Sequence, residues 1–233
     1  MVVAIHQPNY LPWLGYFAKI ARADTFIFLD DVQFSKGSYS NRVQILGGGK
    51  ARWLTLPVAV HLGEPINRVR PRDAQWAASH CAFFRNEYRR AAQFRQVWPE
   101  LEEILLAAPA GEDLAAINQF LVVALSGRLG LSCVFTRSSD FAVSGSADDR
   151  LVELTAAAAP GGIYLSGKGG AKYQDPAKFA AAGLGFAYQN FVHPEYGQGA
   201  LAAGSFVAGL SVVDAVMHLG WEGTAALLAG ERP

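Results

Sequence analysis

Apolar and polar residues follow one another along this chain in blocks that predict strands and helices in turn. An apolar run over residues 1–5 predicts a buried strand, and residues 25–29 predict a second one. Between them, residues 11–21 predict a helix that begins with Pro12 in its first turn. The later pattern predicts strands over residues 51–60, 132–136, 162–165 and 184–190, and helices over residues 147–158, 176–182, 210–219 and 222–228. Strands that alternate with helices in this way are typical of a parallel sheet.

The middle third of the chain carries helical patterns. Residues 74–94, 98–106 and 113–129 each predict a helix, and the last of these ends at Gly130. A helical insertion into one α/β unit fits this order better than two independent domains. We therefore predict an α/β fold with a mostly parallel Rossmann-like sheet, in which residues 1–233 form a single domain and residues 74–130 a largely helical insertion.

Composition and charge exclude some classes of partner. Twenty basic and twenty acidic residues give a formal net charge of zero, which argues against a DNA-binding protein. The nearest candidate for a membrane span, residues 114–131, is broken by Asn118, Gln119, Ser126 and Arg128, so no apolar run reaches the length of about 18 residues that a span needs. No signal peptide is visible after Met1. We expect a cytoplasmic protein without a membrane partner.

The first candidate site consists of polar residues that follow the first two strands. These are His6, Gln7 and Asn9 after the first strand, and Asp30, Asp31, Lys36, Asn41 and Arg42 after the second. Because ligands bind at the carboxyl ends of parallel strands, the two groups are expected to meet. A histidine beside a carboxylate can act as a general base or acid, and two carboxylates could equally hold a hydrated Mg²⁺. The alternative is that these residues only cap turns.

Two further polar segments follow later strands. The segment YLSGKGGAKYQD supplies Ser166, Gly167, Lys168 and Tyr173, and its glycines favour an anion site although the spacing of a P-loop is absent. An ordinary strand-to-helix loop would explain it equally well. The segment QNFVHPEYGQG supplies Gln189, His193, Tyr196 and Gln198. His193 precedes a proline and is therefore expected in an extended conformation, but it could also be a structural histidine.

These same segments resemble the WbqC-like protein family. The resemblance is carried by HQPNYLPWLGYFAKI, by DDVQF with Lys36, Asn41 and Arg42, and by WLTLPV; near the end it continues through YLSGKGG with Tyr173, HPEYGQG and LSVVDAVMHLG. It covers nearly the whole chain. What it implies is a place beside bacterial surface-polysaccharide genes and an activity such as glycine transfer to an amino sugar.

A weaker likeness links the opening of the chain to nucleotidylyltransferase-like α/β folds, some of which form amides through an acyl adenylate. The chain departs from them because Trp13, Gly15 and Tyr16 stand where their paired histidines would fall. This likeness makes ATP with Mg²⁺ a candidate cofactor and leaves its use open.

Together these features predict an acyl or aminoacyl transferase, glycyl transfer included, or another amide-forming enzyme such as a ligase, acting on an amino group of a sugar nucleotide or related small molecule. His6 or His193 would remove the amine proton, and Asp30 or Asp31 would orient that base or bind a metal. The side chains of Lys36, Arg42 and Lys168 would hold phosphate or carboxylate. Aminoacyl-tRNA is a second candidate partner beside the small-molecule substrate. The alternative function is a non-catalytic small-molecule-binding protein of a polysaccharide or natural-product pathway.

Overall fold

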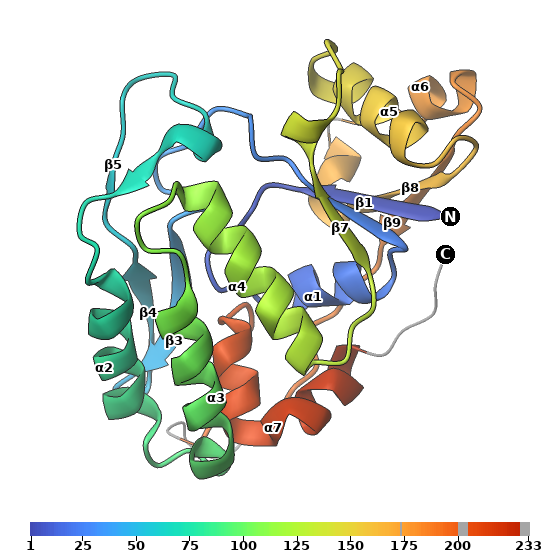
Figure 1. The fold of residues 1–233 in the computed structure, drawn as a ribbon. Coiled ribbons are helices and arrows are strands. Elements are labelled where there is room, and N and C mark those ends of the chain that lie inside the picture. The colour runs from blue at the N-terminus through green and yellow to red at the C-terminus, as the bar shows by residue number, and fades with distance from the viewer. Residues whose placement is uncertain (173, 200–204, 229–233) are drawn as a thin grey trace.

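The computed structural model describes residues 1–172, 174–199 and 205–228. At its centre lies a five-stranded sheet in the order β7-β2-β1-β8-β9, in which every neighbouring pair is parallel (Figure 1). The strands are β1 (Val2–His6), β2 (Thr25–Phe28), β7 (Val134–Arg137), β8 (Ile163–Gly167) and β9 (Gly185–Gln189). This sheet confirms the predicted α/β, Rossmann-like fold.

Both faces of the sheet are covered, which explains why its strands read as continuous apolar runs. Side chains alternate along β1, so Val2 and Ala4 join one hydrophobic cluster whereas Val3 and Ile5 join another. The first cluster contains α1 (Leu14–Ala21), and the second contains residues of α5 (Ala147–Ala158) and α6 (Pro176–Ala181). The fold therefore has three layers, with the sheet in the middle (Figure 1).

The helices of the middle third extend the α1 side of this core. They are α2 (Trp76–Tyr88), α3 (Phe94–Ala107) and α4 (Leu114–Arg128). Of these, α3 packs against α2, α4 and also α7 (Val212–Leu228) near the end of the chain. The carboxylate of Asp113 caps α4 by accepting a hydrogen bond from the Ala116 amide. Among the described residues, no helix is long and apolar enough to cross a membrane.

Two small antiparallel pairs lie outside the main sheet. They are β3 (Arg42–Gly47) with β4 (Lys50–Thr55), and β5 (Val58–Ala59) with β6 (Arg70–Pro71). The predicted strand over residues 51–60 is therefore wrong as one element, because it is interrupted before Val58, where Pro57 cannot donate to a ladder. The partner strand β3 was not predicted. Three short 3-10 helices complete the fold: η1 (Ile66–Arg68), η2 (Ser138–Asp140) and η3 (Lys168–Lys172).

Helix boundaries also differ from the sequence pattern. The first helix begins at Leu14 rather than Leu11, because Leu11 has a positive φ of 42° and Trp13 is extended. The predicted helix over residues 74–94 ends at Tyr88, and α3 begins at Phe94 rather than at residue 98. The break predicted between the last two helices falls at Gly220, whose φ is 76° inside α7.

Candidate functional site

A cavity of about 420 Å³ opens at the carboxyl ends of β1, β8 and β9. It brings together six of the residues that the sequence marks as site candidates: His6, Ser166, Gly167, Lys168, Gln189 and His193. The remaining walls come largely from α1 and its approach, through Trp13, Gly15, Tyr16 and Lys19. Segments more than 150 residues apart in the sequence thus meet at one place, as expected for the end of a parallel sheet.

His6 is held in one tautomer at the end of β1. Its Nδ1 lies 3.0 Å from the carbonyl oxygen of Gln7, and because a carbonyl only accepts, Nδ1 must carry the proton. The Tyr16 hydroxyl donates to the same carbonyl. Burial, followed by the charge of Lys19, lowers the pKa of His6 from 6.5 to about 4. At neutral pH the ring is therefore neutral and its Nε2 is a proton acceptor.

Lys19 is the residue that the sequence pattern missed. It is buried in α1, lines the cavity and donates from Nζ to the Ile5 carbonyl at 2.8 Å. Burial lowers its pKa from 10.5 to about 7. One signal was available: Lys19 lies one helical turn after Gly15 and Tyr16, in an otherwise apolar helix. A lysine on the buried face of such a helix indicates a site rather than a solvated surface.

The loop after β8 forms the opposite wall. The Ser166 hydroxyl donates to the side-chain oxygen of Gln174, and the Gln174 amide nitrogen donates to the Tyr164 hydroxyl. Gly170 packs against Ser166 and Gln174 so closely that a Cβ atom would collide with both. Lys168 is exposed and forms no ion pair with a described residue. Tyr173 lies outside the described residues.

The candidate residues on β9 and after it lie in two different places. The Gln189 amide donates to the Gly15 carbonyl at 2.8 Å, so it ties β9 to α1 across the floor of the cavity. His193 is half-buried against Phe191, and burial lowers the pKa of its ring. Tyr196 and Gln198 lie elsewhere, where both donate to the fully buried carboxylate of Asp214.

A second cavity, of about 540 Å³, lies beside the first and shares part of its wall. Ile5, His6, Tyr164 and Gln174 line both cavities. Gln7 lines only the second, together with α5 residues that include Arg150. His6 therefore stands between two spaces, each large enough for a small molecule.

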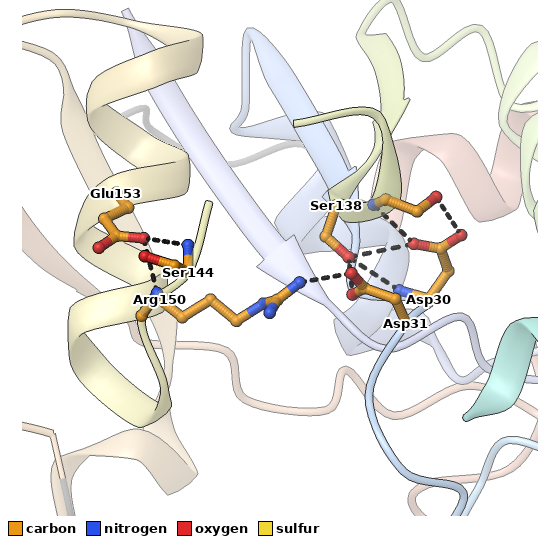
Figure 2. A network of polar contacts seen from close by, with 8 residues as sticks. Asp30, Asp31, Ser138, Ser144, Arg150 and Glu153 are labelled. Atoms are coloured by element: carbon orange, nitrogen blue, oxygen red, sulfur yellow. Dashed lines mark hydrogen bonds and ion pairs between the residues drawn. The ribbon is translucent and has the colours of Figure 1, made fainter. Parts of the chain in front are cut away.

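The two aspartates after β2 form a network of their own (Figure 2). Asp30 is buried and accepts from the hydroxyls of Ser138 and Ser139, and Arg150 reaches from α5 to pair with Asp31. Neither aspartate lines the two cavities that His6 lines. Within the described part of the chain, no group of three or more His, Cys, Asp or Glu side chains is placed to hold a metal ion. The hydrogen bonds from Ser138 and Ser139 to Asp30 hold the ends of β2 and β7 together.

The other candidates of the opening motif also lie outside these cavities. Lys36 and Asn41 line a separate cavity of about 800 Å³, and the Asn41 amide donates to the Leu56 carbonyl. Arg42 stacks on the ring of Trp53. Asn9 is buried and lines neither cavity of His6.

Comparison with known proteins places almost the whole chain in one family. The model of the WbqC-like protein family matches residues 7–226. A protein of Mycobacterium tuberculosis strain H37Rv, described as uncharacterized protein Rv1507c, is 30% identical over 222 residues, which is 94% of this chain and 94% of that protein. No solved structure matches the chain. The match of residues 7–226 spans both walls of the first cavity, and the chain belongs to the WbqC-like protein family.

Proposed function

We propose that this protein is an acyl or aminoacyl transferase that forms an amide on an amino group of a sugar nucleotide or related small molecule. The observation that carries the proposal is the state of His6: a neutral imidazole, fixed with its proton on Nδ1, at the junction of two cavities. A transferase needs space for a donor and an acceptor on either side of its base, and this arrangement supplies both.

The chemistry of each wall supports a role. The glycine-rich loop with Lys168 suits an anionic group, either a phosphate or a carboxylate, because backbone amides and an ammonium can surround it. Lys19 adds a second amine, whose pKa of about 7 leaves it part charged and part neutral near physiological pH. His193 faces the same space and can donate to or accept from a substrate.

The reaction needs only proton transfers and one acyl exchange. The amine nitrogen attacks the acyl carbonyl carbon, the new C–N bond forms, and the bond from that carbon to the leaving oxygen breaks. The nitrogen becomes cationic on attack and is then far more acidic than a free ammonium, so an imidazole with a pKa of about 4 can take its proton. The proton then passes to the leaving oxygen. A free acid as donor would first require activation, for which ATP with Mg²⁺ is the candidate cofactor.

The test is product formation with defined donors. The purified protein is incubated with an amino-sugar nucleotide and either glycyl-tRNA or glycine with ATP and Mg²⁺, and the amide is sought by mass spectrometry. We expect His6→Gln to lower kcat by about 10²- to 10⁴-fold, the usual contribution of a general base. His61→Gln is the matched control, because His61 is exposed and lines neither cavity of His6.

Three outcomes separate the possibilities. An amide whose rate is unchanged in His6→Gln would remove His6 from the mechanism. No amide with any donor, although the small molecules bind tightly, would favour the non-catalytic binding protein. Activity that requires glycyl-tRNA would identify aminoacyl-tRNA as the donor.

A further inference from the structure

Three aromatic rings lead from the first cavity to the surface. Trp13 lines the cavity beside His6, with ring centroids 6.1 Å apart. The Trp13 ring is 5.0 Å from that of Tyr39, which is 5.5 Å from that of Trp53. We call Trp13, Tyr39 and Trp53 the aromatic track. It begins at the proposed catalytic histidine and ends on the exposed face of the β3–β4 hairpin.

The outer end of the track is exposed to an unusual degree. Tyr39 is 37% exposed and Trp53 is 42% exposed, whereas Trp76 and Trp98 are buried. A single exposed aromatic residue needs no explanation, because folded proteins commonly have apolar atoms at the surface. A row of rings that starts inside a cavity is different, since each ring extends the same apolar surface. Such a row can bind one planar or ring-shaped part of a ligand that lies in the cavity.

The charge of the segment that carries Tyr39 and Trp53 selects among ligands. Residues 32–63 contain Lys36, Arg42, Lys50 and Arg52 and no Asp or Glu, in a chain whose net charge is zero. None of these four cations forms an ion pair with a described residue. The guanidinium of Arg42 lies 4.1 Å from the centre of the Trp53 ring. Cations without ion pairs, one of which lies on an exposed ring, favour a ligand that has both an aromatic ring and negative charge.

A neutral sugar fits this surface less well. It would leave the four cations of residues 32–63 without a negatively charged partner. A nucleotide satisfies both features, because its base stacks on aromatic side chains and its phosphates attract arginine and lysine.

We infer that the aromatic track and Arg42 form the base-binding subsite for a nucleoside diphosphate, the carrier part of a nucleotide-linked substrate. The rings of Tyr39 and Trp53 are tilted 58° to each other, so the base stacks on one of them and meets the other at its edge, and Arg42 attracts the phosphates. The inference rests on the proposed function in one respect: the group attached to the diphosphate extends along Trp13 towards His6. The amino group to be acylated then lies in the first cavity, while the base stays near the surface.

Binding measurements test the subsite without any need for turnover. Isothermal titration calorimetry is performed with uridine and adenosine diphosphates, and with pyrophosphate as the ligand that lacks a base. We expect Trp53→Ala and Tyr39→Ala each to weaken nucleoside diphosphate binding by about 5- to 150-fold, the loss typical of one base-stacking contact. Pyrophosphate affinity should not change. Trp53→Phe should keep most of the affinity, because it keeps a flat ring.

Phe120→Ala provides the matched control. Phe120 lies on α4 and is 36% exposed, nearly as much as Tyr39, but it is not part of the track. The Phe120→Ala variant should bind the nucleoside diphosphates and pyrophosphate like the wild type. The inference is overturned if pyrophosphate binds as tightly as the nucleoside diphosphates, or if both track variants bind them normally. It is also overturned in favour of RNA if a single-stranded oligonucleotide binds at least tenfold tighter than either diphosphate with a steep salt dependence.

The two proposals fail in different ways. If the protein binds nucleoside diphosphates through the track but forms no amide, the subsite is supported and the transferase function is contradicted. If Trp53→Ala forms the amide on a sugar nucleotide with an unchanged KM, the transferase function is supported and the subsite is contradicted.

Discussion

Lys19 acts on the pKa of His6 across the wall of the first cavity. The charge of Lys19 is the second cause of the low pKa of His6, after burial, and both side chains are anchored by backbone carbonyls of β1 and its end. A cation at this point keeps the imidazole unprotonated, so Nε2 remains available as an acceptor. The pair explains how a partly buried histidine stays neutral in a cavity suited to anions.

Replacement of Lys19 should therefore change the titration of His6. In Lys19→Met, which keeps the length of the side chain, we expect the His6 pKa to rise above about 4 without reaching 6.5, because burial remains. The ring proton shifts of His6, followed by NMR across pH 3 to 8, measure it. Lys36→Met, which removes an exposed lysine that lines neither cavity of His6, should leave the titration unchanged. An unchanged His6 pKa in Lys19→Met would show that burial alone lowers it.

At the scale of elements, the loop after β8 depends on one glycine and not on its neighbour. A Cβ atom at Gly170 would collide with the Ser166 hydroxyl and the Gln174 amide, whereas a Cβ atom at Gly169 would meet nothing within 4 Å. Gly170→Ala should therefore displace this wall of the cavity. We expect it to lower the free energy of unfolding by about 1–3 kcal/mol, as overpacking usually does, and to lower kcat/KM for amide formation.

Gly169→Ala is the control for this loop, and it should be close to wild type in both measurements. Urea unfolding and the assay for amide formation provide them. Equal effects in the two variants would mean that the loop responds to lost backbone freedom rather than to contact with Ser166 and Gln174.

Regular elements could be predicted from the sequence where packing and local pattern agree. The helix over residues 147–158 has the predicted bounds, and every strand of the main sheet was expected close to its place. The pattern failed where tertiary contacts decide the backbone. Leu11 takes a positive φ in a segment where its carbonyl accepts from the Ser211 hydroxyl, two hundred residues away, and this contact delays α1 to Leu14.

The candidate site was predictable in part for the same reason. Strand ends place His6, Ser166 and His193 at one edge of the sheet, and the order of the elements is enough to bring them together. Asp30 also follows a strand, but the hydroxyls of Ser138 and Ser139 take up its carboxylate. No local pattern reveals a partner more than a hundred residues away. The catalytic or binding role of each residue stays a prediction.

At the scale of the whole molecule, one hydrophobic cluster joins the sheet to the middle helices. Phe26 of β2, Phe17 of α1, Phe84 of α2 and Leu121 of α4 all belong to it. The helices of residues 76–128 therefore bury their apolar faces against the α/β part and not against each other alone. A single domain over residues 1–233 stays a prediction, and this shared core supports it.

Buried histidines make the stability of the whole fold depend on pH. The pKa values of His6 and His80 are both lowered by burial from 6.5 to about 4, and burial also lowers those of His193 and His218. Between pH 6.5 and 4 the unfolded chain thus binds more protons than the folded chain. The stabilisation is complete above pH 6.5 and is lost as the pH falls towards 4, by up to about 1.4 kcal/mol per pH unit for each group.

His80 contributes to this pH dependence of stability and lies outside the two cavities of His6. Its Nδ1 lies 2.6 Å from the Tyr10 hydroxyl, which donates to it while the ring is neutral. Urea unfolding at pH 7.5, 6.0 and 5.0 should give a falling free energy for the wild type and a shallower fall for His80→Gln, because Gln takes up no proton. His61→Gln, at an exposed position, should follow the wild type. Parallel pH curves for His80→Gln and the wild type would exclude His80 as a source of the acid sensitivity.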